Sequence, residues 1–551
     1  MLFKGSGLAA SSGRGSLSAL NRDQRERRAL PFAIALATLL VGSLHAAVLS
    51  RDWSDGTLTL KLDDGSAQIE WLSPVAFRYA RSFGGVLPST HISHEAVAPT
   101  FEDTTSVLRM KSKYLTVEID RADARVRVRA ADTAVTESLA KLEGGDAMVA
   151  MKLKPDERIF GLLGGASGKL NLREEKIERR HGFFFTSAGY GIYVESPEPC
   201  LFDLDGGAIQ ARSSAIEYDF YYGPTAKEIM EQHENTHPHN EVKAESLDLL
   251  APDRLPRQAT PLPKVAVKSW NAFAALIRTI NQWSLSTVTY PALDLSVFDS
   301  APRDVKARAA DLSSLFPIIY RTAGEGGIEV ATRQAWTPYL TTYLREAYDR
   351  GYPLVRPLPM QFSRDANSDQ QADVFMLGDE VLLAPVLTSG SKRRLTLPRG
   401  NWTDVRTNQE YRGNQVVEVD APAGRVPMFV RNGWIVPLAV KDRMELHYYP
   451  SLGAEFFLWE PDANENSQFH AAPAGDFMRV EIESKKRRTY EWILHHTKAP
   501  REVGEESGAY QKVASRDQLQ PGKWWHDDAQ NNLHLMLRSE AVTDRIVNIS
   551  F

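Results

Sequence analysis

Residues 351–358, GYPLVRPL, and residues 375–386, FMLGDEVLLAPV, mark the place where the pattern of the sequence changes. Between residues 265 and 351, apolar residues recur at helical spacing and alternate with short strand-like runs, which is typical of βα units. The first quoted stretch reads as a buried strand. From Leu377 to the end the apolar period is two, which predicts one or two β-sandwiches.

Three stretches before residue 351 have helical spacing, and the run 286–295 between the first two reads as a strand. The third helix has Thr337 and Pro338 as its N-cap and first turn, and Gly351 as its stop. The predicted helices are 270–283, 304–316 and 337–350.

Residues 57–222 show short alternating runs separated by Asp, Gly and Ser clusters, which is typical of an antiparallel β-sandwich. Thr225 and Glu228 have the spacing of a capping box, so a helix is expected to follow. Prolines then crowd residues 251–264 and predict a linker, because proline disrupts both helices and strand ladders.

Composition limits the classes of function. The chain has 551 residues, 43% of them hydrophobic and 25% charged, which is typical of a globular protein of several domains. The net charge of −5 gives no electrostatic reason to expect a nucleic-acid partner. Cys200 is the single cysteine, which excludes an intrachain disulfide and a zinc site with several thiolates.

The N-terminus has the order of a secretory signal peptide: arginines at 25, 27 and 28, an apolar run over 29–44, and small residues at Ala46 and Ala47. We expect cleavage near Ala46 and a periplasmic or extracellular protein without stable membrane insertion. A retained anchor or an upstream start-site error are the alternatives. The run is shorter than the roughly 20 residues that span a bilayer, which favours a removed signal.

The boundaries of the predicted domain plan follow from these changes of pattern, and the domain types named in it are those that the family resemblance described below implies. It comprises a signal peptide (1–47), an N-terminal β-sandwich of galactose-mutarotase type (48–240), a linker (241–264), a partial TIM barrel (265–376), a proximal C-terminal β-sandwich (377–442) and a distal C-terminal β domain (443–551).

Several motifs resemble glycoside hydrolase family 31, the α-glucosidase and α-xylosidase family. Those similar to its N-terminal sandwich are ERIFG (157–161), GKLNLR (168–173) and GYGIYV (189–194), and YYGPT (221–225) resembles the entry to its barrel. The two stretches quoted at the outset resemble the last barrel strand and the start of the next domain. LPRGNWTD (397–404) and VPMFVRNG (426–433) continue the resemblance.

The resemblance implies retaining hydrolysis of α-glycosides by two aspartates on loops of a (β/α)8 barrel. Such a pair lies about 5 to 5.5 Å apart. A complete barrel takes about 250 residues, whereas residues 264–357 number 94, enough for two or three βα units. The predicted fold is therefore multidomain β plus α/β, with a truncated barrel remnant between β-sandwiches.

Neither catalytic aspartate is found on this alignment. The first five barrel strands are missing, and with them the Trp-x-Asp-x-x-Glu type segment that supplies the nucleophile. The Gly-Asp-Asn signature that carries the acid/base should fall just before Trp270, but residues 265–268 read VAVK. The resemblance thus predicts a protein that is inactive or only binds carbohydrate.

Three residues are candidate sugar contacts by the resemblance: Asp294, Arg321 and Trp336. Their surroundings depart from the family: LSVF (295–298) replaces Ile-Gly-Gly-Phe, and Ala323 replaces a sugar-binding histidine. The alternative is that they are a paired buried acid, its ion partner and a core aromatic residue.

The clusters of histidines and of acidic residues are weaker evidence for a functional site. His233, His237 and His239 suggest a metal site, but Pro238 breaks any helix there and a solvated loop is the alternative. Acidic pairs at 203/205, 325/329 and 365/369 are equally explained as turn or surface residues. We predict no metal and no cofactor.

Two functional hypotheses remain from the sequence. One is an active exported α-glycosidase that uses unidentified carboxylates. The other is a non-catalytic relative that binds an α-glucoside or α-xyloside. The strands of an incomplete barrel would also leave exposed edges, which could pair with another chain to form an oligomer.

Overall fold

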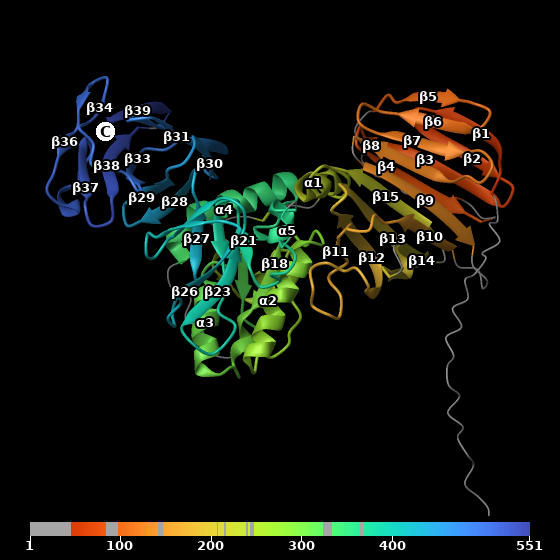
Figure 1. Cartoon of the computed structure of the whole chain (residues 1–551), viewed down its shortest axis with the longest axis horizontal. Helices are drawn as coiled ribbons and strands as arrows, with labels where there is room; N and C mark the ends of the chain where they lie inside the picture. The colour runs from red at the N-terminus through yellow and green to blue at the C-terminus, as the bar shows by residue number, and fades with distance from the viewer. Residues whose placement is uncertain are drawn as a thin grey trace, which may run out of the picture. The chain divides into compact units, whose positions relative to one another are not determined.

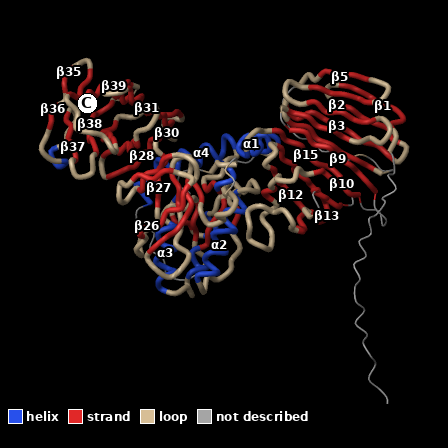
Figure 2. The backbone as a smooth tube through the Cα atoms, viewed as in Figure 1, coloured by secondary structure: helices blue, strands red, loops and turns tan. Residues whose placement is uncertain are grey.

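The structure, a computed structural model, describes residues 46–83, 87, 97–131, 133–141, 147–205, 208–213, 216–238, 241–242, 247–322, 333–363, 365, 367–540 and 542–551. The α-helices lie in the middle of the chain, drawn from olive to teal in Figure 1, and strands make up the parts before and after them (Figure 2). The signal peptide predicted at 1–47 lies outside the described residues, apart from Ala46 and Ala47. None of the helices in the described ranges has both the length and the apolar composition needed to cross a bilayer.

The strands before residue 223 form one fifteen-stranded antiparallel sheet. They are β1 (Val48–Ser54), β2 (Thr57–Leu62), β3 (Gly65–Ser73), β4 (Ala76–Ser82), β5 (Thr100–Asp103), β6 (Val107–Lys111), β7 (Thr116–Asp120), β8 (Val126–Ala130), β9 (Thr133–Lys141), β10 (Ala147–Lys152), β11 (Ile159–Gly161), β12 (Lys176–Thr186), β13 (Tyr190–Asp203), β14 (Ala208–Ser213) and β15 (Ile216–Tyr222). The order is β1-β2-β3-β4-β15-β13-β14-β10-β9-β8-β7-β6-β5, and β12 joins β11 to β13. Leu58 on β2 and Val117 on β7 share one core, so the sheet packs against itself as the predicted sandwich.

Helix α1 (Ala226–Thr236) follows, and its capping box is confirmed. The Thr225 hydroxyl accepts from the backbone N–H of Glu228, and the Glu228 carboxylate accepts from the backbone N–H of Thr225 at 2.9 Å. These two bonds satisfy N–H groups that have no partner within a helix, which fixes where α1 begins.

A small parallel sheet comes next. Its strands are β16 (Leu249–Leu250), β17 (Thr260–Pro261), β18 (Pro291–Asp294) and β19 (Ile318–Tyr320), in the order β16-β19-β18-β17. Helix α2 (Trp270–Ser284) joins β17 to β18, and α3 (Arg303–Ser313) joins β18 to β19, close to the predicted positions of both helices. Among the described residues the sheet is open, with β16 and β17 at its edges.

Residues 241–264, predicted as a linker, thus contribute two short strands to this sheet. The backbone N–H groups of Thr260 and Leu262 donate to Tyr290 and Ala292 at 2.9 Å each. Pro261, between them, is on an edge strand and its missing N–H is not needed for this ladder. The prolines therefore limited the strand to two residues without preventing it.

Helix α4 (Arg333–Arg350) begins at Arg333, so the predicted start at Thr337 and Pro338 is wrong, and Pro338 lies inside the helix. The buried Arg333 guanidinium donates to the carbonyl groups of Ser313 and Phe316. These hydrogen bonds to the end of α3 stabilise an additional N-terminal turn of α4. They join residues that are far apart in the sequence, so a rule based on the local effect of proline does not predict them. The predicted stop is confirmed: α4 ends at Arg350, and Gly351 has φ +70°.

Strand β20 (Val355–Pro357) pairs antiparallel with β21 (Phe375–Leu377) and is not part of the parallel sheet, in which β19 has β16 and β18 on its two sides. The prediction that β20 is the last strand of the barrel is therefore wrong. Its sheet has the order β20-β21-β22-β27-β24-β25, and β23 and β26 form a separate pair. The other elements here are α5 (Leu358–Gln361), β22 (Val381–Leu383), β23 (Lys392–Leu397), β24 (Asn401–Asp404), β25 (Glu410–Arg412), β26 (Gln415–Asp420) and β27 (Met428–Arg431).

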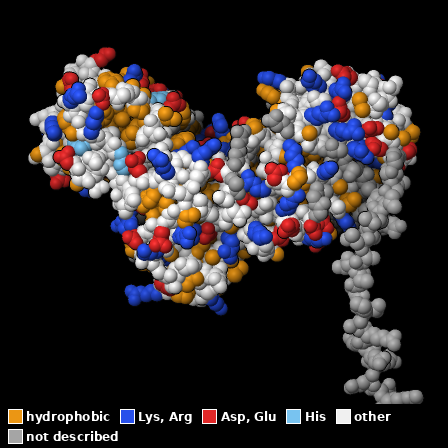
Figure 3. Space-filling view, in the orientation of Figure 1, with side chains coloured by type: hydrophobic (Ala, Val, Ile, Leu, Met, Phe, Trp, Pro, Cys, Tyr) orange, Lys and Arg blue, Asp and Glu red, His pale blue; other side chains and the backbone are white. Residues whose placement is uncertain are grey.

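Two six-stranded sheets end the chain and share one core, as the predicted sandwich requires. The first contains β28 (Trp434–Val440), β29 (Arg443–Tyr449), β33 (Arg488–Leu494), β38 (Asn532–Ser539), β37 (Lys523–Asp527) and β36 (Gln511–Lys512), in that order. The second contains β30 (Ala454–Glu460), β31 (Glu465–Ala474), β32 (Phe477–Ser484), β39 (Thr543–Ser550), β34 (Glu502–Glu505) and β35 (Gly508–Ala509). On the face shown in Figure 3, acidic and basic side chains are interspersed.

Candidate functional site

The parallel sheet brings Asp294 and Arg321 to the same edge. Asp294 is the last residue of β18 and pairs with Tyr320, the last residue of β19. Arg321 follows directly. The carboxyl ends of parallel strands are where α/β proteins place their functional side chains, so this edge is the first place to look for a site.

Asp294 is fully engaged in hydrogen bonds inside the protein, and its side chain is 1% exposed. Its carboxylate accepts from the hydroxyl of Ser296 at 2.7 Å and from the hydroxyl of Thr322 at 2.6 Å, and from the backbone N–H of both residues. Burial opposes ionisation, but these hydrogen bonds outweigh it and lower the pKa of Asp294. Asp294 thus links the ends of two neighbouring strands.

A lysine faces Asp294 where the family resemblance leads one to expect a second acid nearby. The Lys264 ammonium lies 3.5 Å from the Asp294 carboxylate and 5.7 Å from the centre of the Tyr320 ring. Val265, within the stretch that replaces the acid/base signature, is 68% exposed. Arg321 has its own partner, Asp299, at 2.8 Å. The chemistry of this edge is that of ion pairs and hydrogen bonds rather than of two facing carboxyl groups.

Trp336 is on α4 and lines a different space from the other two predicted residues. It packs edge-to-face on Tyr339 at 5.6 Å and lines a cavity of about 300 Å³ together with Asp404 and Arg425. Asp294 and Arg321 do not line that cavity. The structure therefore places two of the three predicted contacts together and separates the third.

Asp294→Asn is expected to lower the free energy of unfolding by about 1 to 3 kcal/mol, because the amide group would face hydroxyl and N–H donors with a donor of its own. Urea denaturation at pH 7 measures this. The ionised Asp294 carboxylate stabilises the wild-type protein, and this stabilisation is lost as the pH falls through the lowered pKa of Asp294. The difference in the free energy of unfolding between wild type and Asp294→Asn should therefore narrow below about pH 4. Asp299→Asn, at an exposed pair, is the control; an equal effect of the two changes would contradict the structural role of Asp294.

The other constellations found in the sequence are explained by local structure. His233 and His237 stack at 4.7 Å beside the Tyr221 hydroxyl, and His239 lies outside the described residues. In the part of the chain that the structure describes, no three His, Cys, Asp or Glu side chains are grouped as metal ligands. The acidic pairs take part in turns and ion pairs, such as Asp203 with Lys176 at 2.7 Å. The pair at 325/329 is outside the described residues.

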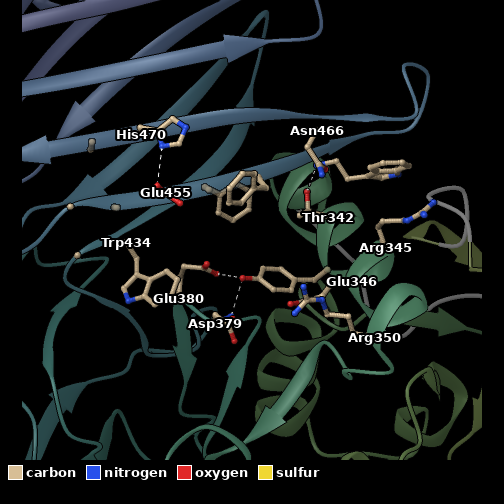
Figure 4. Close-up of a pocket in the computed structure, with 18 of the residues that line it drawn as sticks. Thr342, Arg345, Glu346, Arg350, Asp379, Glu380, Trp434, Glu455, Asn466 and His470 are labelled. Carbon is tan, nitrogen blue, oxygen red and sulfur yellow. Dashed lines mark hydrogen bonds and ion pairs between the residues drawn. The ribbon is translucent and has the colours of Figure 1, made fainter. Parts of the chain in front are cut away.

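A cavity that the sequence analysis missed has a volume of about 960 Å³ (Figure 4). Its walls are α4, the turn between β21 and β22, the start of β28, and strands β30 and β31. Figure 4 shows Asp379 and Glu380 on one side and Glu455 and His470 on another. The sequence signal at this cavity is LGDE (377–380), within the stretch that resembles the start of the domain after the barrel.

Glu380 in this cavity wall is buried, 2% exposed, and its carboxyl group accepts hydrogen bonds from two tyrosines. Its Oε2 lies 2.7 Å from the hydroxyl of Tyr339, which itself lies 2.6 Å from the carbonyl oxygen of Leu377. The Glu380 Oε2 accepts from the hydroxyl of Tyr339 and also from the hydroxyl of Tyr343 at 2.6 Å, and these hydrogen bonds oppose the rise in its pKa. Burial, together with the charge of Asp379, raises the pKa of Glu380 to about 7.

The pKa of Asp379, next to Glu380 in the sequence, is shifted in the opposite direction. Burial disfavours its charge, but Arg356 and Lys227 outweigh this and lower its pKa to about 2. The Lys227 ammonium lies 2.5 Å from the Asp379 carboxylate, and Arg356 also contacts it. Two neighbouring carboxyl groups are therefore held in different protonation states near neutral pH.

Comparison with known proteins agrees with the motifs. Residues 351–436 match the family model described as the glycosyl hydrolase family 31 C-terminal domain. Alpha-glucosidase 2 of Bacillus thermoamyloliquefaciens is 32% identical over 165 residues, which cover 28% of this chain and 20% of that protein. An alpha-xylosidase of Saccharolobus solfataricus is 29% identical over 144 residues, 24% of this chain and 20% of that protein. The matched stretches thus span about a fifth of the length of these relatives.

Solved structures show the same fold. A family 31 dextranase of Flavobacterium johnsoniae, complexed with glucose, has a TM-score of 0.79 at 13% identity, covering 92% of this chain and 100% of that one. A family 31 α-xylosidase of Xanthomonas citri has a TM-score of 0.67 at 11% identity, covering 80% and 96%. Residues 351–436 thus belong to the glycosyl hydrolase family 31 C-terminal domain family, and the chain shares the fold of solved family 31 structures.

Proposed function

We propose that this chain is a carbohydrate-binding member of family 31 that does not hydrolyse glycosides. One observation carries the proposal: Asp294, the acidic residue at the carboxyl edge of the parallel sheet, is saturated with hydrogen bonds and faces Lys264. Retaining hydrolysis needs two carboxyl groups about 5 to 5.5 Å apart that reach the same anomeric carbon. A buried carboxylate beside an ammonium group does not meet that need.

The parallel sheet supports the same proposal. Strands β17, β18 and β19 with helices α2, α3 and α4 form three successive βα units, which we interpret as the end of the family's barrel. A remnant of this length has no strand on which the nucleophile segment of a complete barrel would lie. The dextranase with the same fold was solved with glucose and, as a variant, with isomaltotriose, which makes α-linked glucosides the first ligands to test. Arg321 and Trp336 remain proposed sugar contacts, whereas the saturated carboxylate of Asp294 favours the alternative of a paired buried acid.

Purified protein is expected to show no turnover of aryl α-glucosides or aryl α-xylosides above the rate of a protein-free blank, because the two-carboxylate geometry is missing. Release of the chromogenic aryl group is the measurement. In parallel, isothermal titration calorimetry with isomaltotriose and maltotriose is expected to show binding. Retaining hydrolysis that disappears in Asp294→Asn would overturn the proposal.

A second candidate, retaining hydrolysis with other carboxylates, is favoured by one observation. Asp379 and Glu380 have pKa values of about 2 and about 7, and an acid and a base with separated pKa values are what such catalysis uses. Against it, Glu380 is buried beneath two tyrosines and Asp379 is bound to Arg356 and Lys227. Turnover that survives Asp294→Asn but is lost in Glu380→Gln would favour this candidate.

Three points stay predictions from the sequence. They are export with cleavage near Ala46, the domain boundaries, and association of copies through the edges of the parallel sheet.

A further inference from the structure

We infer that the cavity of about 960 Å³ between α4 and strands β28, β30 and β31 binds a short neutral oligosaccharide. This inference rests on the proposed carbohydrate-binding function and gives that function a location away from the edge of the parallel sheet. The volume lies at the upper end of the range for small-molecule sites, which favours a ligand of several sugar rings over a single one.

Aromatic side chains supply apolar surface in this cavity. Phe457 on β30 lines it and is 47% exposed, although exposing a large apolar ring to water is unfavourable. Trp434 and Trp459 line it as well, and the Arg345 guanidinium lies 4.3 Å from the centre of the Trp459 ring. Flat aromatic surfaces that combine with polar groups suit a pyranose ring, which has an apolar face and a hydroxyl-bearing rim.

Polar groups surround these rings and come from separate elements. Glu455 on β30 lies 3.5 Å from His470 on β31, and the Thr342 hydroxyl on α4 accepts from the backbone N–H of Trp459 at 3.0 Å. Asn466 lies at the same wall and offers both a donor and acceptors (Figure 4). Such groups can exchange hydrogen bonds with sugar hydroxyls from more than one direction.

The charges of the lining favour a neutral ligand. Acidic side chains outnumber the arginines Arg345 and Arg350, which disfavours a phosphate or another anion. Arg345 is paired with Asp349 at 2.8 Å and Lys227 with Asp379 at 2.5 Å, so cations are already present to balance two of the acids. A ligand rich in hydroxyl groups needs no net charge to bind to carboxylate acceptors.

Phe457→Ala tests the site, with Phe477→Ala as its matched control. Phe477 is 40% exposed and lies on β32, in the same sheet as Phe457, but does not line the cavity. In calorimetric titrations with isomaltotriose and maltotriose, Phe457→Ala is expected to raise Kd by about tenfold, the effect of losing one aromatic contact. Phe477→Ala should stay within about twofold of wild type. Because both rings are exposed, both variants should fold, and circular dichroism checks this.

Glu455→Gln is a second variant, which keeps the shape of the side chain and removes its charge. It is expected to raise Kd by about threefold to tenfold through loss of a charged acceptor. If wild-type protein binds either trisaccharide and neither Phe457→Ala nor Glu455→Gln weakens binding, the site is wrong while the proposed function stands. If wild-type protein binds neither sugar, the proposed function itself fails and the inference with it. A cationic amino-sugar trisaccharide that binds more tightly than isomaltotriose would overturn the neutral-ligand assignment.

Discussion

Arg356→Ala is expected to lower the free energy of unfolding by about 3 to 5 kcal/mol, as found when one partner of a buried ion pair is removed. The Arg356 side chain is 0% exposed. It contacts the carboxylates of Glu346 on α4 and Asp379 after β21, and donates to the carbonyl group of Pro353 at 3.0 Å. Alanine would leave a buried carboxylate with fewer partners and a space where the guanidinium was.

Urea denaturation monitored by tryptophan fluorescence measures this effect. Arg479→Ala is the control, because Arg479 pairs with Glu481 at the surface and such pairs contribute about 1 kcal/mol or less. Arg356→Lys should fall between the two, since an ammonium keeps the charge but lacks the fork that reaches two carboxylates at once. Equal free energies of unfolding for Arg356→Ala and Arg479→Ala would contradict the central role of this arginine.

Wild-type stability is expected to fall by roughly 2 to 4 kcal/mol between pH 5 and pH 8 through Glu380 alone. The folded protein holds the Glu380 proton up to about pH 7, whereas the ordinary pKa of a glutamate is 4.5. Between these values the folded state binds more protons than the unfolded state. The contribution of Glu380 is therefore complete below about pH 4.5, declines as the pH rises, and levels off above about pH 7.

Glu380→Gln isolates this effect, because glutamine is neutral at every pH and its amide oxygen can accept from the hydroxyl of Tyr339 as the carboxyl group does. The free energy of unfolding of wild type minus that of Glu380→Gln should decrease by roughly 2 to 4 kcal/mol from pH 5 to pH 8. Other titrating groups cancel in that difference. Glu418→Gln, at the exposed pair with Lys392, should show almost no such change. A difference that is flat in pH for Glu380→Gln would show that Glu380 is already ionised at pH 5.

The order of structural types could be predicted from the sequence because it follows from local periodicity. Alternation with a period of two predicted the sandwiches on either side, and helical spacing predicted α2 and α3 close to their observed positions. The capping box at Thr225 and the glycine at residue 351 fix the ends of helices through backbone groups a few residues away. The motifs at 351–386 identified the family without a structure.

The pairing of distant segments could not be predicted in the same way. Proline density predicts a linker at 251–264, but β17 lies within this stretch and β16 directly before it, because β18 and β19 offer free backbone groups to pair with. The first turn of α4 depends on Arg333 reaching the end of α3. In each case the deciding contact joins residues that are far apart in the sequence.

The sequence by itself determined the family of residues 351–436, the succession of strand-rich and helical parts, and the lack of an acid in residues 265–269, since each of these depends on residue identity and short-range spacing. Only the tertiary structure decided that Lys264 faces Asp294, that Trp336 lies apart from both, and that a cavity lies beside Glu380. The walls of that cavity come from segments between residues 342 and 472. Packing brings them together, and burial then sets the protonation of Glu380, which no local pattern specifies.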